Sequence, residues 1–255
     1  MPIFTAGSIK LDADLFVFDK DGLMFDSEQF WIEMINARCR ELLSMISPDE
    51  TLRWASLMGA DTVLTADGEP RTTFVDPLGV CAVASPLEES TITAGYLVAL
   101  RGCPWHEARA AAVSFLERSN LILDLKKALK PQPGFIGLMR RLAELKLPYG
   151  IATSDNFERT RDSMVLYGFW EDVRFVVTPE EVKNGKPAPD MLLYISEKTG
   201  VPPERIAMVG DSYVDVKMAS NAGSIGIGVS TDPEMRKKMK PYASAVLDSL
   251  AEIVI

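Results

Sequence analysis

Short apolar runs recur along the chain, and each has the pattern of a buried β-strand. The clearest covers residues 15–18 (LFVF) and stops directly before Asp19. Runs of this length that end in turn or polar residues are typical of strands covered on both faces. We predict further strands at residues 149–152, 174–177, 206–209, 224–229 and, with a weaker pattern, 244–247.

Helical patterns alternate with the later strands. Apolar residues between Phe135 and Leu145 follow the i, i+3, i+4, i+7 spacing of a helix face. Helical segments at 157–167, 189–199 and 213–222 are each followed by a glycine, the residue that most readily adopts the left-handed backbone at a helix end. Alternating strands and helices predict the α/β class, with a Rossmann-like, doubly wound parallel sheet as the core.

Residues 29–130 interrupt this alternation. They are mostly helical in pattern, whereas the α/β pattern begins at residue 15 and resumes after Pro131. Within them, residues 59–86 are rich in Thr, Pro, Gly and Asp, and we predict an irregular insert there, whose role stays open. The sequence thus predicts an α/β core from residues 1–28 and 131–255 and an inserted helical domain from residues 29–130.

Composition and charge narrow the possible functions. The 255 residues are 47% hydrophobic and 25% charged, as in an ordinary globular protein. A net charge of −9 lacks the basic surface of a nucleic-acid binder. No run approaches 18 apolar residues and the first residues have no signal-peptide pattern, so we expect a cytoplasmic protein without membrane association. One histidine, His106, and three cysteines without ligand spacing argue against a zinc site.

Polar residues that could carry chemistry follow several of the predicted strands. The four clusters contain Asp19 and Asp21; Thr153 and Ser154; Lys186; and Asp211 and Asp215. Each cluster has an ordinary explanation by itself, such as a helix cap or a solvated lysine. In a parallel sheet, however, all four would meet at the carboxyl ends of the strands. Clustered carboxylates without His or Cys suit Mg²⁺, and a lysine with hydroxyls suits a phosphoryl group.

The ordered motifs FDKDG, IATS, GKPAPD and VGDSYVD resemble those of the haloacid dehalogenase-like (HAD) hydrolase superfamily. The long insert between the first and second motifs is similar to that of the branch containing phosphoglycolate phosphatases and β-phosphoglucomutases, in which the insert is a helical cap. The resemblance covers about residues 15–28 and 131–229. It implies a Mg²⁺-dependent phosphatase that hydrolyses a small phosphorylated metabolite through an aspartyl-phosphate, in a monomer or small homo-oligomer.

The resemblance also implies roles for individual residues. Asp19 would be the nucleophile and Asp21 the general acid and base. Thr153, Ser154 and Lys186 would bind the phosphoryl group. Mg²⁺ would be held by Asp19, the backbone carbonyl of Asp21 and Asp211, with Asp215 in or just behind that shell.

Two departures from the family pattern bear on this assignment. Mutases of the branch carry a histidine in the first cap helix, and the matching position here is Trp31, which disfavours a sugar-phosphate mutase without excluding it. Lys20 replaces the apolar residue usual between the two aspartates, and a side chain directed to solvent is its simplest interpretation. A non-catalytic protein that binds a phosphorylated ligand stays a further alternative, although intact Asp19, Asp21, Lys186 and Asp211 weigh against it.

Overall fold

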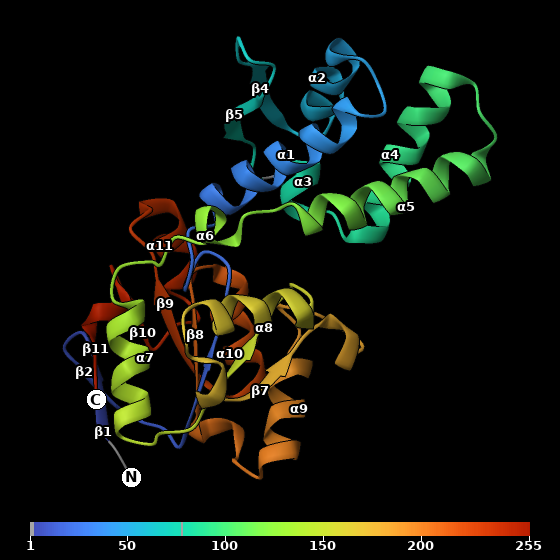
Figure 1. Cartoon of the computed structure of the whole chain (residues 1–255). Helices are drawn as coiled ribbons and strands as arrows, with labels where there is room; N and C mark the ends of the chain where they lie inside the picture. Colours follow the sequence, from blue (N-terminus) through green and yellow to red (C-terminus); the bar gives the residue numbers. More distant parts are fainter. Residues whose placement is uncertain (1–2, 78) are drawn as a thin grey trace. The chain divides into compact units, whose positions relative to one another are not determined.

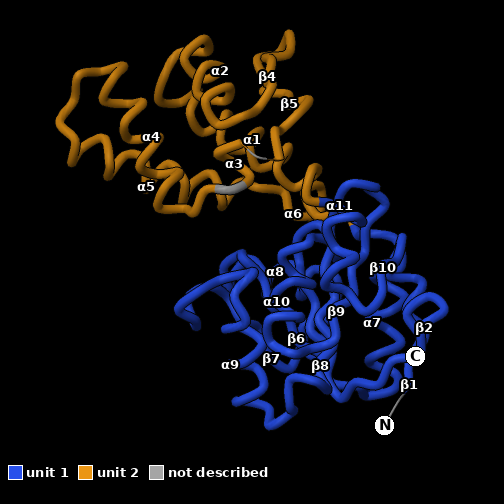
Figure 2. Tube along the Cα trace, turned by 180° about the vertical axis from the view of Figure 1, so that it is seen from behind, with its two compact units in different colours: residues 1–26, 131–255 blue, residues 27–130 orange. Residues whose placement is uncertain are grey.

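The computed structural model describes residues 3–77 and 79–255, and the chain forms two compact units (Figures 1 and 2). The core unit comprises Met1–Asp26 and Pro131–Ile255, and the insert unit comprises Ser27–Lys130. Each unit has its own buried apolar cluster, and each is described by itself below.

A six-stranded parallel sheet forms the centre of the core unit, in the order β10-β9-β8-β3-β6-β7. The predicted α/β fold class is therefore confirmed, and each of the six predicted runs forms one of these strands. Their bounds are β3 (Leu15–Phe18), β6 (Tyr149–Ala152), β7 (Val173–Val177), β8 (Ile206–Gly210), β9 (Ile225–Val229) and β10 (Ala245–Leu247). From β3 the chain continues to β6 and β7 on one side and then to β8, β9 and β10 on the other, so the strand order reverses beside β3.

Helices follow the strands in the core unit, as the alternating pattern predicts. They are α7 (Phe135–Glu144), α8 (Phe157–Leu166), α9 (Asp190–Thr199), α10 (Tyr213–Ala222) and α11 (Pro233–Met239), with short 3-10 helices η1 (Trp170–Asp172), η2 (Pro179–Glu181), η3 (Pro203–Arg205) and η4 (Leu250–Glu252). Gly168, Gly200 and Gly223, at the predicted helix ends, all have positive φ.

Alternate residues of β3 face opposite sides of the sheet. Leu15 and Val17 pack in one apolar cluster with residues of α9 and α10. Phe16 and Phe18 stack on the other side, where Phe16 meets Phe4 edge to face. This sandwich fixes the position of the residue that follows Phe18.

A small antiparallel sheet, which the sequence pattern did not predict, joins the two ends of the chain in the order β11-β1-β2. Its strands are β1 (Ile3–Ala6), β2 (Ile9–Asp12) and β11 (Ile253–Val254). Gly7, with φ of 61°, turns the chain between β1 and β2.

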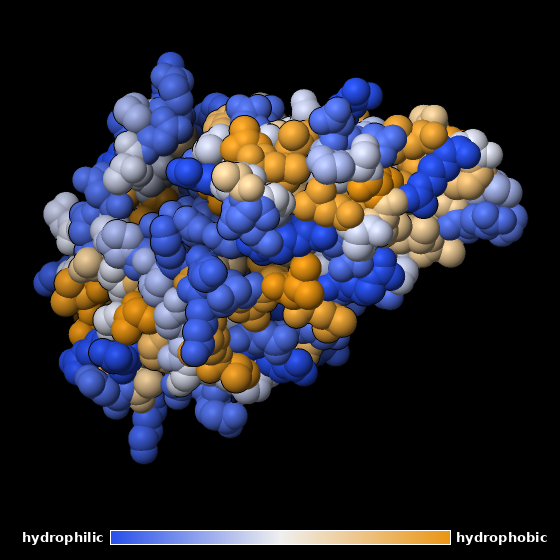
Figure 3. All heavy atoms as spheres, turned by 45° about the horizontal axis from the view of Figure 1, so that its top comes forward, coloured by the Kyte–Doolittle hydropathy of each residue, from blue (hydrophilic) through white to orange (hydrophobic). Residues whose placement is uncertain are grey.

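The insert unit is mainly helical. Its helices are α1 (Ser27–Leu43), α2 (Pro48–Leu57), α3 (Val80–Val83), α4 (Pro86–Arg101), α5 (Trp105–Leu121) and α6 (Leu125–Ala128). Trp54 is buried at its centre, meets Phe115 edge to face and donates a hydrogen bond to Thr93. Hydrophobic and hydrophilic residues are interspersed on the face shown in Figure 3. Over residues 3–77 and 79–255, no helix combines the length and the hydropathy needed to cross a bilayer.

The prediction of irregular structure at residues 59–86 is wrong for much of that segment. An antiparallel hairpin, β4 (Ala60–Leu64) with β5 (Pro70–Val75), occupies it and is followed by α3. Gly68 takes φ of 83° in the turn, and the Thr72 amide donates to Asn36 Oδ1 of α1 at 2.8 Å. Asp67-Gly68 at the turn is a typical hairpin sequence, which the overall composition of residues 59–86 does not reveal.

Candidate active site

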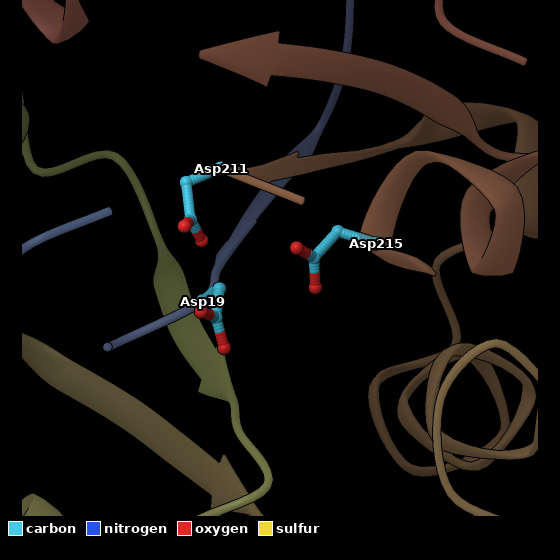
Figure 4. Close-up of side chains that lie close together, drawn as sticks. All are labelled: Asp19, Asp211 and Asp215. Carbon is cyan, nitrogen blue, oxygen red and sulfur yellow. The ribbon is translucent and has the colours of Figure 1, made fainter. Parts of the chain in front are cut away.

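Three carboxylates meet at the carboxyl ends of two neighbouring strands. Asp19 follows β3, Asp211 follows β8, and Asp215 lies in the first turn of α10. Because Phe18 and Val209 are paired in register, the chain leaves both strands at the same level. One oxygen from each carboxylate lies within 4.8 Å of the others, and Figure 4 shows all three groups turned toward a common space.

Two glycines let the backbone close around these carboxylates. A Cβ at Gly22, where φ is 85°, would lie 2.1 Å from Asp211 Oδ2. A Cβ at Gly210 would lie 2.2 Å from the Cβ of Asp215. Real side chains do not approach this closely, so both positions require glycine for the observed arrangement.

Lys186 supplies a positive charge to this cluster. Its Nζ donates to Asp19 Oδ1 at 2.6 Å and to Asp215 Oδ1 at 2.7 Å, and its side chain is only 4% exposed. Asn221 of α10 holds the adjoining loop by donating to the Pro187 carbonyl at 2.9 Å. The buried ammonium therefore has a fixed position between two carboxylates.

Burial and repulsion between carboxylates raise the pKa values of Asp19 and Asp211. Burial raises the pKa of Asp19, and Asp215 adds to the effect while Lys186 opposes it. The pKa of Asp211 lies well above its usual range because of burial and the charges of Asp19 and Asp215. Burial lowers the pKa of Lys186, but the two facing carboxylates outweigh burial and raise it overall. The ammonium stays charged at neutral pH, whereas the carboxylates need further compensation.

Asp21 lies near this cluster but makes a different contact. Its Oδ1 accepts a hydrogen bond from Lys20 Nζ at 2.5 Å, and its side chain is 26% exposed. Burial raises the pKa of Asp21, and the charge of Lys20 opposes that rise. A carboxyl group with a raised pKa keeps its proton to higher pH, as a general acid requires.

The expectation that Lys20 points to solvent is wrong. Its side chain is fully buried, and Nζ lies 2.5 Å from Asp21 Oδ1 and 2.8 Å from Asp155 Oδ2. Asp155 follows β6, the strand beside β3, and motif reading did not select it. The local sequence shows only that a carboxylate, Asp155, lies two residues after Thr153. Lys20 becomes its partner when β3 pairs with β6.

The two hydroxyl residues after β6 differ in exposure. Thr153 is buried, and its Oγ1 accepts a hydrogen bond from the Asp155 amide at 3.1 Å, which ties the hydroxyl to the turn after β6. Ser154 is exposed in the following turn. The structure thus brings Asp19, Lys186, Asp211 and Asp215 into direct proximity, with Asp21 and Thr153 on the adjoining loops.

The cluster has the composition and charge of a site for Mg²⁺. Its donors are carboxylate oxygens, the ligands that hard divalent cations prefer. Three carboxylates and one ammonium leave two negative charges, which a divalent cation would neutralise. Within the described parts of the chain, no Lys or Arg forms an ion pair with Asp211, the group whose pKa is most clearly raised.

We expect Mg²⁺ to raise the melting temperature more at pH 8 than at pH 5. A carboxyl group whose folded pKa is raised binds its proton more tightly in the folded chain. That stabilisation is complete below the unfolded pKa, about 4, and disappears as the pH rises through the folded pKa. Without metal, the core unit therefore loses stability from Asp19 and Asp211 as the pH rises. Mg²⁺ replaces the protons, so it binds best once they have left.

Thermal unfolding with excess Mg²⁺ or EDTA at both pH values measures this difference. At 100 times the dissociation constant, a ligand adds about 2.7 kcal/mol. The Asp211→Asn variant is the matched control and should lose most of the increment. An equal Mg²⁺ effect at both pH values, or in D211N, would contradict the assigned site.

Comparisons with known proteins give a family match and several relatives. A sequence model of the haloacid dehalogenase-like hydrolases matches residues 13–223. A probable pseudouridine-5'-phosphatase from Drosophila melanogaster is 28% identical over 141 residues, which cover 53% of this chain and 61% of that protein. The mitochondrial (DL)-glycerol-3-phosphatase 1 of Arabidopsis thaliana is 26% identical over 246 residues, covering 92% of this chain and 70% of that protein. The chain thus spans less than two thirds of the first relative's length.

Solved structures share the fold. A putative β-phosphoglucomutase from Thermotoga maritima superposes with a TM-score of 0.59 at 19% identity, over 94% of this chain and 95% of that one. A predicted phosphoglycolate phosphatase from Haemophilus somnus gives 0.59 at 15% identity, over 94% and 96%. The expected resemblance to this branch is confirmed at the level of the fold. With the family match over residues 13–223, it places the chain in the haloacid dehalogenase-like hydrolase family, as a hydrolase.

Proposed function

We propose that this hydrolase is a Mg²⁺-dependent phosphatase that acts on a small phosphomonoester. The observation that carries the proposal is Lys186, held between Asp19 and Asp215 beside Asp211 at the carboxyl end of β3. A buried ammonium and a site for a divalent cation around one carboxylate suit the transfer of a phosphoryl group, whose charge spreads over several oxygens. The phosphatase names of the two relatives support the same reaction class.

In the proposed mechanism Asp19 attacks phosphorus. The bond from phosphorus to the leaving oxygen breaks as a carboxylate oxygen of Asp19 forms the new bond, giving an aspartyl-phosphate. Asp21 transfers its proton to the leaving oxygen. It then accepts a proton from water, which attacks phosphorus and releases phosphate and the Asp19 carboxylate.

Other residues of the site hold the reacting groups. Lys186 fixes the Asp19 carboxylate and offsets charge on the phosphoryl oxygens, and Thr153 donates its hydroxyl to them. Mg²⁺, bound by Asp19, the Asp21 carbonyl and Asp211 with Asp215 in support, would supply further positive charge at the phosphoryl group. The insert unit is the candidate source of substrate selection, because the core residues account for the reaction but not for the alcohol part of the ester.

Release of phosphate from p-nitrophenyl phosphate, with Mg²⁺ and with EDTA, tests the reaction. We expect turnover with Mg²⁺ and its loss with EDTA. A panel containing pseudouridine 5'-phosphate, glycerol 3-phosphate and phosphoglycolate, scored by kcat/KM, then identifies the substrate class. Isomerisation of a sugar phosphate without phosphate release would indicate a mutase. Tight binding without turnover would indicate a non-catalytic binding protein.

A further inference from the structure

Lys20 connects two loops that carry separate parts of the site. It lies directly between Asp19 and Asp21, and its side chain is fully buried. Its Nζ contacts Asp21 Oδ1 in its own loop at 2.5 Å and Asp155 Oδ2 in the loop after β6 at 2.8 Å. Since β3 and β6 are neighbouring parallel strands, the ammonium joins two adjacent strand ends.

Asp155 is itself held from several directions. Its Oδ1 accepts from the Asn156 amide at 2.8 Å and lies 3.5 Å from Arg159 Nη1. Its own amide donates to Thr153 Oγ1 at 3.1 Å. Lys20 is thus anchored on a carboxylate that is fixed to the turn carrying the phosphate-binding hydroxyl.

This anchoring restricts the carboxyl group of Asp21. One of its two oxygens is occupied by Lys20, so rotation about the Cβ–Cγ bond would break a charge-assisted hydrogen bond. A proton carried by Asp21 must then reside on the other oxygen, Oδ2. Because the Lys20 side chain has no exposed surface, its ammonium acts on a substrate through the groups packed against it, among them Asp21 and Asp155.

We propose that Lys20 is a positioning residue that fixes the orientation of the Asp21 carboxyl group by tying it to Asp155 in the neighbouring loop. The proposal rests on the proposed phosphatase function, in which Asp21 protonates the leaving oxygen. The proposal explains why a lysine is buried at this position, although an apolar residue would be buried at a lower cost in free energy. Loss of Lys20 therefore impairs both proton transfers by Asp21, to the leaving oxygen and from the attacking water, and leaves attack by Asp19 in place.

Leaving groups of different basicity separate these two effects. Phenyl phosphate needs a proton at its leaving oxygen, whereas 2,4-dinitrophenyl phosphate expels a stable anion without one. For Lys20→Met we expect kcat/KM on phenyl phosphate to fall by about 100-fold or more, the usual contribution of a positioned acid. We expect little change in kcat/KM on 2,4-dinitrophenyl phosphate, because kcat/KM covers the steps up to the aspartyl-phosphate and not the later activation of water by Asp21. Asp155→Asn, which keeps the side-chain size, should likewise lower kcat/KM on phenyl phosphate and change it little on 2,4-dinitrophenyl phosphate. It replaces K20M as the test if K20M does not fold.

Two further variants make the test specific. Arg205→Met is the control for stability, because it removes a cation that bridges Asp12 and Asp14 at the opposite ends of the strands. If this variant loses activity through reduced folding, the loss should be equal for both esters. In an Asp21→Asn background, K20M should add little, because the group it positions is already gone.

The outcomes separate the two proposals. Equal losses for both esters in K20M and D155N, or full activity of K20M on phenyl phosphate, would overturn the role of Lys20 while the phosphatase function stands. Failure of the wild-type protein to hydrolyse either ester would overturn the phosphatase function and this inference with it.

Discussion

The Asp19→Asn variant is expected to release no measurable phosphate from any ester that the wild-type protein hydrolyses. The amide of asparagine is a poor nucleophile and cannot form the aspartyl-phosphate, and removal of a covalent nucleophile typically costs about 10⁴- to 10⁶-fold in kcat. The fold should persist, because the substitution keeps the size of the side chain and an oxygen that can accept from Lys186. Steady-state phosphate release measures the loss, and thermal unfolding checks the fold.

A labelling experiment gives the same prediction a chemical readout. Acid quench of wild-type protein with substrate, followed by peptide mass spectrometry, should locate phosphate on Asp19 and should find none in D19N. Asp12→Asn is the matched control, since Asp12 is a carboxylate on the surface of the core unit, paired with Arg205. Wild-type turnover by D19N, with an intact mass that excludes deamidation, would refute the assigned nucleophile.

The Lys186→Met variant should have the second largest effect. Methionine keeps most of the volume of lysine but removes the charge that contacts Asp19 and Asp215. Loss of one group that stabilises developing charge lowers kcat by about 10²- to 10³-fold. Stability should also fall, because removing one partner of a buried ion pair costs about 3–5 kcal/mol.

The loss of stability in Lys186→Met should be larger at pH 8 than at pH 5. The pKa values of Asp19 and Asp211 are raised, so these groups take up protons as the pH falls. Protonation reduces the repulsion between carboxylates that Lys186 otherwise offsets. Urea unfolding at both pH values, with EDTA present, measures this difference. Lys183→Met alters an exposed lysine of the same loop and should change neither kcat nor stability. Similar effects in the two variants would argue against a specific role for Lys186.

Local pattern was enough to predict the central sheet. The four apolar residues of β3 are buried on both faces, so they form a continuous run that needs no knowledge of the neighbouring strands. The helix ends at Gly200 and Gly223 follow from the backbone freedom of a single residue. Strands β1 and β2 lack such a run, since each has only four residues and several of these are exposed, and β1 takes its second partner, β11, from the far end of the chain.

The candidate site shows the same division between local and distant information. Asp19, Asp211 and Asp215 are recognisable because each follows a strand or begins a helix, and parallel strands bring such positions together. Lys20 and Asp155 were not predicted as partners, because their contact depends on the pairing of β3 with β6 across more than half of the chain. Adjacent residues in a motif gave no indication of which direction the Lys20 side chain takes.

The two ends of the insertion also lie side by side in the core unit. Phe25, just before the chain leaves the core unit, forms a bridge with Pro131, where the chain returns. Exit and return at one point mean that the length and content of the inserted segment place little strain on the sheet. The inserted segment can therefore vary in length or content without displacing the strand ends that carry Asp19 and Asp211.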